Sequence, residues 1–175
     1  MEKLRQNIVD VIEEGQLKLG YREETMRLYY PLSSLCGFAG KQMDAAQMQR
    51  ELEAFFRAQA PELGRIQVSR KGEKFCLAVP PQGVAYVHAH TDRDGFLSGL
   101  IQAIEKPGCT LQMLLHQFHR YSDHVHLEAL HNGEFDYLIY FEDGVPDGFR
   151  YCITDEGNHM TYHRFTKEDY EAFGF

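Results

Sequence analysis

The sequence lacks the features that mark several large functional classes. No apolar stretch approaches the roughly 20 residues needed to cross a bilayer, and the opening MEKLR is too charged for a signal peptide. It contains no glycine-rich loop of the Walker or Rossmann type and no G-x-S-x-G motif. We therefore expect a cytoplasmic protein with no membrane partner.

Cysteine is scarce and dispersed. The four cysteines are Cys36, Cys76, Cys109 and Cys152, and none belongs to a C-x-x-C pair. Most lie among apolar neighbours, which favours buried thiols in a reducing compartment. Cys36 precedes a glycine, as some reactive thiols do, but no paired-cysteine signature accompanies it.

Basic residues are outnumbered by acidic ones. Lys and Arg total 18 against 26 Asp and Glu, which gives a net charge of -8. Because an acidic field repels phosphate backbones, we expect no nucleic-acid partner. The 175 residues, with 43% hydrophobic and 25% charged, fit one globular domain, and no repeat or linker divides them. We predict a single domain over residues 1–175 and make no prediction of its oligomeric state.

Helical periodicity dominates the first third of the chain. The first predicted helix places Leu4, Ile8, Val11 and Ile12 on one face. A second helical segment is predicted over residues 22–30, ending before Pro31. Asp44 is the predicted N-cap of a third helix over residues 45–60, whose core stripe is Met48, Leu52, Phe55 and Phe56.

Strand periodicity follows. A hairpin is predicted over residues 65–79 with a turn at Lys71-Gly72, and residues 84–87 are predicted as a third, largely buried strand. Two helices come next, with Asp94 and Thr110 as predicted N-caps. We predict an α+β fold in which N-terminal helices pack on a mainly antiparallel sheet.

The last third of the chain predicts a four-strand meander and a short last helix. The strands are HVHLEAL, EFDYLIYF, FRYCIT and HMTYHRF, and a tight turn at Asn132-Gly133 is predicted to join the first two. The aromatic side chains of these strands are predicted to fill a sheet face. Thr166 and Asp169 form a predicted capping box for the last helix, KEDYEAF.

The first candidate site lies in VAYVHAHTDRDG, residues 84–95. Alternate residues of a strand share a face, so His88, His90 and Asp92 would point the same way if the strand continued that far. Imidazole nitrogen and carboxylate oxygen suit zinc or another divalent metal. These residues are therefore the candidate ligands of a metal-dependent hydrolase centred on His88 and His90, with Asp94 as an alternative third ligand.

The same stretch resembles two families of metal enzymes. His-x-His-x-Asp is how the metallo-β-lactamase signature begins, but Arg93 stands where that signature has a histidine. His88 and His90, followed by seven residues and Ser98, resemble the motif of the JAMM metalloproteases. That resemblance implies that the two histidines are zinc ligands and that Ser98 supports a tetrahedral intermediate. The ligand Asp of the motif is replaced by Ile101.

A second candidate cluster lies further along the chain. His116 and His119 share a helical face, and His124, His126 and Glu128 alternate on one predicted strand face. These are metal-ligand residue types, so this strand is the second candidate metal site. The alternative is a solvated sheet face, with Val125, Leu127 and Ala129 on the core side.

The C-terminal stretch FDYLIYFEDGVPDGFRYCITDEGNHMTYHRF, together with YYPLSSL, resembles an uncharacterised bacterial family of unknown function. This resemblance implies a stand-alone cytoplasmic bacterial domain and no particular activity. For function we prefer a small acidic binding or regulatory module without catalytic activity or cofactor, whose partner carries a basic surface. Its steering surface would be formed by Glu142, Asp143, Asp147, Asp155 and Glu156. The alternative is that these are solvated turn residues.

Overall fold

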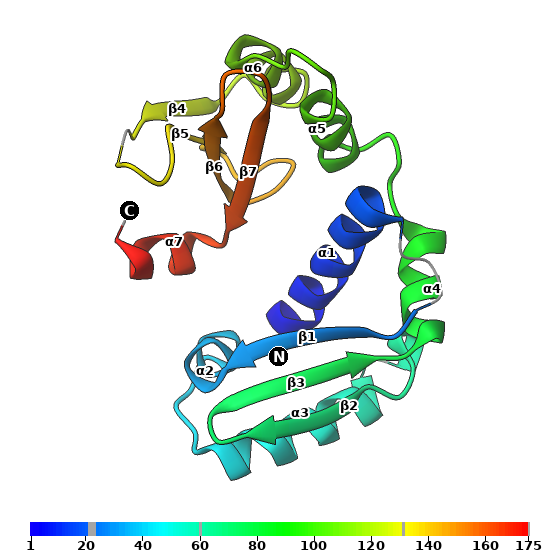
Figure 1. Ribbon diagram of the computed structural model, residues 1–175. Helices are drawn as coiled ribbons and strands as arrows, with labels where there is room; N and C mark the ends of the chain where they lie inside the picture. The colour runs from blue at the N-terminus through cyan, green and yellow to red at the C-terminus, as the bar shows by residue number, and fades with distance from the viewer. Residues whose placement is uncertain (21–23, 60, 131, 175) are drawn as a thin grey trace. The chain divides into compact units, whose positions relative to one another are not determined.

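The computed structural model describes residues 1–20, 24–59, 61–130 and 132–174. The chain divides into two compact units, an N-terminal unit of Met1–Thr91 and a C-terminal unit of Asp92–Phe175 (Figure 1). Each unit has its own antiparallel sheet, and the predicted α+β class is confirmed. The single domain over residues 1–175 stays a prediction.

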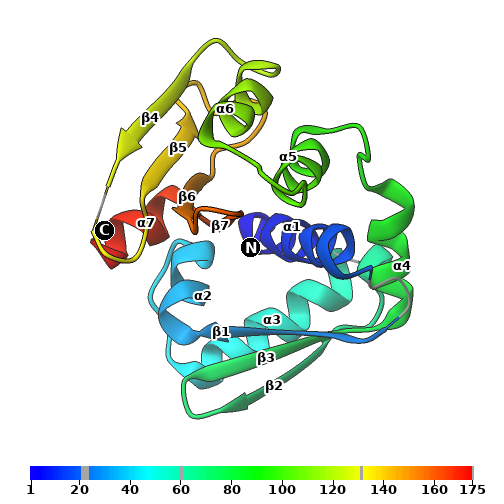
Figure 2. The same cartoon turned by 45° about the horizontal axis from the view of Figure 1, so that its top comes forward.

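The N-terminal unit combines four α-helices with a three-stranded sheet in its described part. Its sheet has the order β1-β3-β2, and all pairs are antiparallel. Figure 2 shows α1 and α3 on the same side of this sheet. The elements are α1 (Glu2–Leu19), β1 (Met26–Pro31), α2 (Leu32–Ala39), α3 (Ala45–Gln59), the short 3-10 helix η1 (Pro61–Leu63), β2 (Gln67–Lys71), β3 (Lys74–Val79) and α4 (Pro81–His90).

One hydrophobic core joins the inner face of this sheet to the helices. Leu28, Phe75, Leu77 and Val79 point inward from β1 and β3, and they pack with apolar residues of α1 and α3. The predicted stripes of both helices are confirmed, except that Val11 is 37% exposed. Asp44 caps α3 as predicted: the Gln47 N–H donates to Asp44 Oδ1 at 2.8 Å. The hairpin of β2 and β3 is confirmed as well.

The predicted helix over residues 22–30 is wrong in its described part, because Met26–Pro31 forms strand β1. Residues 22 and 23 lie outside the described residues. Met26, Leu28 and Tyr30 alternate along the chain, and Leu28 pairs with Leu77 on β3. In so short an apolar run, period-two and helical patterns compete, and the pairing with β3 decides between them.

The predicted strand over residues 84–87 is also wrong, because these residues belong to α4. Pro81 occupies the first helical position, where its fixed φ and missing N–H favour a helix. Val84 and Val87, three residues apart, are both buried. An apolar run of this length does not distinguish a buried helix from a buried strand.

The C-terminal unit places two helices before a four-stranded sheet of order β4-β5-β6-β7, so the predicted meander is confirmed. Thr110 caps α6 as predicted, whereas the N-cap of α5 is Gly95 and not Asp94. The predicted capping box of Thr166 and Asp169 opens α7. The elements are α5 (Phe96–Ile104), α6 (Leu111–His119), β4 (Val125–Ala129), β5 (Tyr137–Phe141), β6 (Arg150–Asp155), β7 (Met160–Phe165) and α7 (Lys167–Phe173).

Aromatic rings fill the inner face of this sheet. The Phe96 ring of α5 packs edge-on against Phe118, Phe141 and Tyr151, with ring centroids 4.8, 4.9 and 5.6 Å away. All four side chains are buried. The prediction that the strand aromatics fill a sheet face is therefore confirmed for Phe141 and Tyr151, whereas Tyr140 is only partly buried and lies on the other face of β5.

The connection between β4 and β5 is longer than the predicted two-residue turn. Ala129 pairs with Tyr137, and beyond this pair the Leu130 N–H donates to the Asp136 carbonyl. The connection between Leu130 and Asp136 therefore comprises residues 131–135. Asn132 Oδ1 accepts hydrogen bonds from the N–H groups of Glu134 and Phe135. Gly133 has a φ of 85°, a conformation that glycine adopts without strain.

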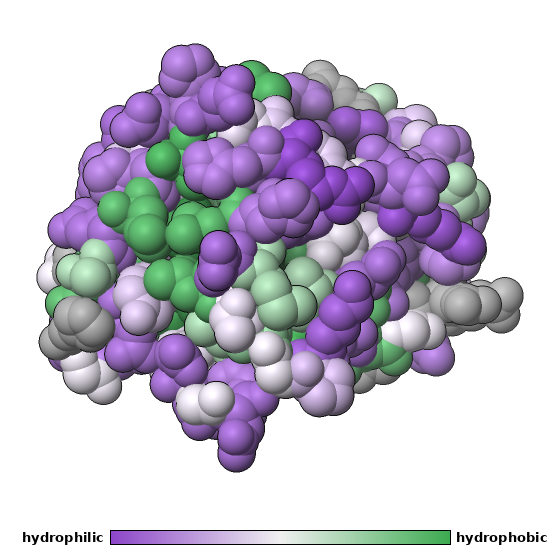
Figure 3. All heavy atoms as spheres, turned by 90° about the horizontal axis from the view of Figure 1, so that it is seen from above, coloured by the Kyte–Doolittle hydropathy of each residue, from purple (hydrophilic) through white to green (hydrophobic). Residues whose placement is uncertain are grey.

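The surface view in Figure 3 shows a mostly hydrophilic face with one smaller hydrophobic area. Among the helices of the described residues, none has the length and apolar character that spanning a membrane requires.

Gly83 provides a test of the contact between α4 and η1, which the predicted strand over residues 84–87 did not include. A Cβ at this position of α4 would lie 2.2 Å from the Leu63 carbonyl oxygen, which belongs to the backbone of η1. We expect Gly83→Ala to lower the free energy of unfolding by about 1–3 kcal/mol, because α4 must move away from η1. Urea unfolding followed by circular dichroism measures this change.

Gly37→Ala is the matched control. Gly37 lies within α2, and a Cβ there meets no atom within 4 Å. We expect this variant to be unchanged or more stable by up to about 1 kcal/mol, because alanine favours the helix. Equal losses in both variants would contradict the close contact between α4 and η1.

Candidate functional site

The first candidate metal site does not have the predicted geometry. His88 and His90 lie on helix α4, where residues two apart point about 200° away from each other around the axis. The Nδ1 atom of His90 is 2.8 Å from the Tyr86 carbonyl oxygen, and its ring packs on Tyr86 with centroids 4.2 Å apart. The shared strand face on which this site depended is therefore absent.

The other predicted residues of that site have local structural roles. Asp92 Oδ1 accepts a hydrogen bond from the Asp94 N–H, which stabilises a turn before α5. Ser98 is buried, and its hydroxyl lies 3.3 Å from Gln102 Nε2. In the described part of the chain, no three His, Cys, Asp or Glu side chains are arranged to hold a metal ion. The JAMM-like resemblance is not borne out.

The second candidate cluster is partly brought together. On β4, His126 Nε2 lies 3.6 Å from Glu128 Oε2. His126 Nδ1 lies 3.6 Å from Glu142 Oε1, so a second carboxylate reaches the same ring from the end of β5. His124 is exposed, and its backbone N–H donates to the Ser122 hydroxyl. His116 and His119 are exposed on α6.

A stack of three side chains crosses the sheet at His126. His126 pairs with Tyr140 on β5, and their rings are stacked with centroids 4.5 Å apart. The guanidinium of Arg150, on β6, lies 3.6 Å from the centroid of the Tyr140 ring. We call His126, Tyr140 and Arg150 the cross-strand stack. Its members come from three neighbouring strands, and the carboxylates of Glu128 and Glu142 flank its histidine end.

The cross-strand stack adjoins a small apolar cluster on the outer face of the sheet. Phe135, Leu138 and Cys152 are buried there, and Tyr170 of α7 packs against them. Burial raises the pKa of the Cys152 thiol to about 11, and burial also raises the pKa of Tyr170. Cys152 is therefore a protonated core thiol at neutral pH and no nucleophile.

The other side of strand β4 lies on the predicted core face but is only partly covered. Val125 and Leu127 pair with the buried Phe141 and Ile139, yet Leu127 is 41% exposed and Ala129 is exposed. The reason is position, because β4 is an edge strand at the end of the sheet. The stack and its two glutamates thus lie at an accessible border of the sheet.

The predicted acidic steering surface separates into different environments. Asp143 is exposed, and hydrogen bonds from the Val145 N–H and the Ser122 hydroxyl lower its pKa. Asp155 Oδ1 accepts a hydrogen bond from the Gly157 N–H. Glu156 Oε2 lies 3.0 Å from His159 Nε2. Glu142 belongs to the surroundings of the stack. These contacts show that most of the five stabilise turns locally.

Asp147, the remaining member, is partly buried. Its Oδ2 accepts a 2.7 Å hydrogen bond from the Tyr151 hydroxyl, and its Oδ1 accepts one from the Phe149 N–H. Burial nevertheless raises the pKa of Asp147 above its ordinary value. This carboxylate therefore supports the loop between β5 and β6 from within.

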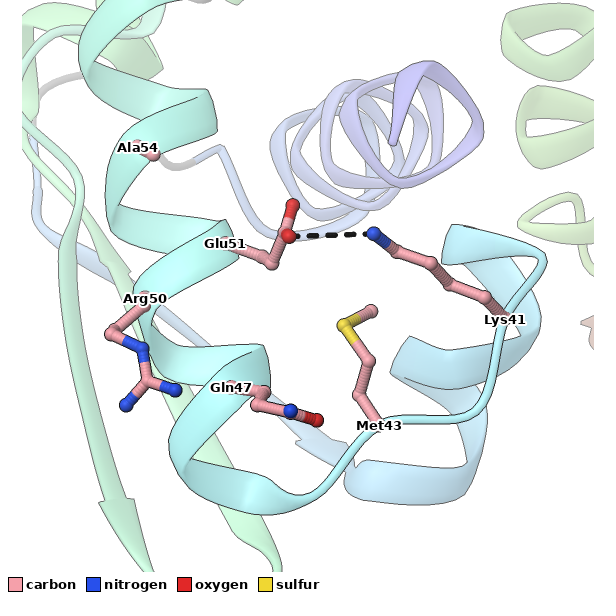
Figure 4. Close-up of a pocket in the computed structure, with 6 residues that line it drawn as sticks. All are labelled: Lys41, Met43, Gln47, Arg50, Glu51 and Ala54. Carbon is pink, nitrogen blue, oxygen red and sulfur yellow. Dashed lines mark hydrogen bonds and ion pairs between the residues drawn. The ribbon is translucent and has the colours of Figure 1, made fainter.

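A pocket of about 550 Å³ lies in the N-terminal unit between α3 and the segment after α2 (Figure 4). Lys41 Nζ and Glu51 Oε1 are 3.3 Å apart across it, while Arg50 points away from the space between them. A charged ligand would have to compete with this ion pair. The pocket is lined by Lys41, Met43, Gln47, Arg50, Glu51 and Ala54.

Sequence reasoning identified His126 and Glu128, and it named Glu142 as an acidic surface residue without placing it beside His126. It missed the roles of Tyr140 and Arg150. Tyr140, Glu142 and Arg150 lie 14 to 24 positions from His126 in the sequence and meet it only through strand pairing. The alignment of HVHLEAL with the reversed EFDYLIYF would have indicated Tyr140 and Glu142, once the loop length was known.

Comparison with known proteins gives one match. A family model described as "Domain of unknown function, E. rectale Gene description (DUF3877)" matches residues 1–174. No curated protein and no solved structure matches the chain.

Asp147 gives a prediction with a defined pH dependence. Because its pKa is raised in the folded protein, the ionised carboxylate lowers stability above that pKa, and acidification through it relieves the loss. We expect Asp147→Asn to be at least as stable as the wild type at neutral pH. Its amide oxygen can accept from the Phe149 N–H, and its NH2 group can donate to the Tyr151 hydroxyl oxygen. The difference in the free energy of unfolding between this variant and the wild type should shrink as the pH falls towards about 4. Urea unfolding at both pH values measures it.

Asp147→Ala is the control for the hydrogen bonds. It leaves the buried Tyr151 hydroxyl without its acceptor, so we expect a loss of about 1–3 kcal/mol at both pH values. Equal losses of stability in Asp147→Asn and Asp147→Ala would show that the buried charge of Asp147 does not destabilise the fold.

Proposed function

The chain belongs to the family of the domain of unknown function DUF3877, and we propose that it is a small acidic cytoplasmic binding module without catalytic activity. Its C-terminal sheet would bind basic side chains of a partner protein at the cross-strand stack. The observation that carries this proposal is the convergence of Glu128 and Glu142 on the two ring nitrogens of His126.

The charge of this site favours a cationic group. The side chains of Glu128 and Glu142 are 55% and 56% exposed. A histidine carries at most one positive charge, so the three side chains together are negative whenever both glutamates are ionised. The excess of acidic over basic residues in the whole chain acts in the same direction and would steer a basic partner towards it.

The shape of the site favours a planar cation. The rings of His126 and Tyr140 stack across two neighbouring strands. Carboxylate oxygens of Glu128 and Glu142 each lie near one nitrogen of the imidazole. A guanidinium offers a planar fork of N–H donors that matches carboxylates, and it also packs on aromatic rings. Arginine is therefore the side chain that the site suits best, with lysine as a weaker alternative.

Arg150 gives the stack a direction. Its guanidinium covers Tyr140 at the end away from the glutamates, so a basic residue of the partner is attracted to the β4 end and repelled from the β6 end. Such paired attraction and repulsion sets the register of a bound segment.

The test uses a fluorescein-labelled peptide of alternating arginine and glycine, followed by fluorescence anisotropy at low salt. We expect Glu128→Gln combined with Glu142→Gln to weaken binding at least about tenfold, equivalent to about 1.4 kcal/mol. Added salt should weaken binding to the wild type, because the glutamates are exposed.

The control changes the same net charge elsewhere in the unit. Glu105→Gln combined with Asp94→Asn alters two exposed carboxylates outside the stack, and binding should change less than about twofold. If the control loses as much affinity as the stack variant, attraction depends on net charge alone and the proposed site is wrong. No binding to the wild type would also overturn the proposal.

A further inference from the structure

We infer that the outer face of the N-terminal sheet binds an acidic polypeptide segment. This surface belongs to a different unit from the cross-strand stack and has the opposite charge, so the inference does not depend on the proposed function. We call it the basic sheet face. Its outward positions are Arg27, Tyr29, Pro31, Gln67, Ser69, Lys71, Lys74, Cys76 and Ala78.

The strand register places these side chains together. Tyr29 lies opposite Cys76, which lies opposite Ser69 on the far strand, so one row crosses all three strands. Lys74 lies opposite both Pro31 and Lys71 in a neighbouring row. Because successive strand residues point to opposite faces, the burial of Phe75, Leu77 and Val79 directs the intervening residues of β3 outward.

The face is open and carries one prominent aromatic ring. Tyr29 is 71% exposed, the highest value among the large hydrophobic side chains of the described residues that are exposed. Cys76 and Ser69, its neighbours across the row, are small, so the ring stands beside a low surface on which an extended segment can lie. No described helix of this unit covers the face (Figures 1 and 2). Exposed aromatic residues of this kind are enriched at protein interfaces.

Charge identifies the occupant. The outward positions include Arg27, Lys71 and Lys74 and no carboxylate, although the whole chain has a net charge of -8. Within the part of the chain that the structure describes, these three cations form no ion pair. Glu73 lies in the turn between β2 and β3, at one end of the face. A segment with carboxylates spaced along it would complement the face.

A polypeptide fits better than nucleic acid. A polynucleotide extends beyond the face and meets the negative field of the rest of the chain, whereas a short acidic segment responds to charges within a Debye length of about 8 Å. Three cations can also neutralise only a few phosphates, and the electrostatic part of nucleic-acid binding grows with the number of phosphates neutralised. The segment would lie across the strands beside Tyr29, with its carboxylates against Arg27 and the two lysines.

The test uses a fluorescein-labelled peptide of alternating glutamate and glycine and a labelled oligothymidylate with the same number of charges. Fluorescence anisotropy at low salt should show that the peptide binds the wild-type chain more tightly than the oligonucleotide. Arg27→Glu combined with Lys74→Glu should weaken peptide binding at least about tenfold, and Tyr29→Ala should weaken it about threefold or more. Circular dichroism confirms that each variant is folded.

A charge-matched control separates the face from net charge. Arg57→Glu combined with Arg65→Glu changes two exposed arginines of the same unit that lie outside the face. Peptide binding to this control should fall less than about threefold. Equal losses in both double variants, tighter binding of the oligonucleotide, or no peptide binding to the wild type would overturn the inference.

Two further measurements distinguish the occupant and the site. Light scattering at the assay concentration should give the mass of one chain; self-association abolished by Arg27→Glu with Lys74→Glu would instead assign the face to a second copy and overturn the inference. Glu128→Gln with Glu142→Gln should leave binding of the acidic peptide undiminished. Weaker binding of the acidic peptide by this variant would place the peptide at the cross-strand stack and contradict its assignment to the basic sheet face.

Discussion

The register of strand pairing is the constraint on which both candidate surfaces depend. In the first sheet the inner strand β3 alternates buried and outward side chains, and its neighbours follow that alternation. In the second sheet β5 directs Ile139 and Phe141 to one face and Leu138 and Tyr140 to the other, and β4 follows it. A slip of one residue would place Tyr29 in the core and Leu28 in solvent, so burial of the apolar set holds the register. The same burial thereby aligns His126 with Tyr140 and Tyr29 with Cys76.

Charge is segregated within this acidic chain. The outer face of one sheet gathers cations around an exposed tyrosine, while the border of the other gathers two carboxylates around a stacked histidine. Net charge alone, read over all 175 residues, predicts only a basic partner. A chain with two surfaces of opposite charge suits a module that holds two different partners, or two parts of one partner.

Much of the fold could be predicted from the sequence because its signals are local. Asp44, Thr110 and Thr166 cap the helices that they were expected to cap, and the alternating strands of the meander pair in the predicted order. Residues 22–30 and 84–87 were assigned wrongly because a short apolar run satisfies both helical and strand periods. The site was harder, since Glu142 and Arg150 reach the stack only through pairing across loops whose length the sequence did not define.

The different environments of the four cysteines make the chain suited to chemical labelling. Cys36, Cys109 and Cys152 are buried, whereas Cys76 is only partly buried and lies opposite Tyr29 in the middle of the basic sheet face. A thiol-reactive fluorophore or spin label would therefore attach first at Cys76 in the native protein. Its emission or mobility would then report occupancy of that face directly, with no mutation needed to introduce the label.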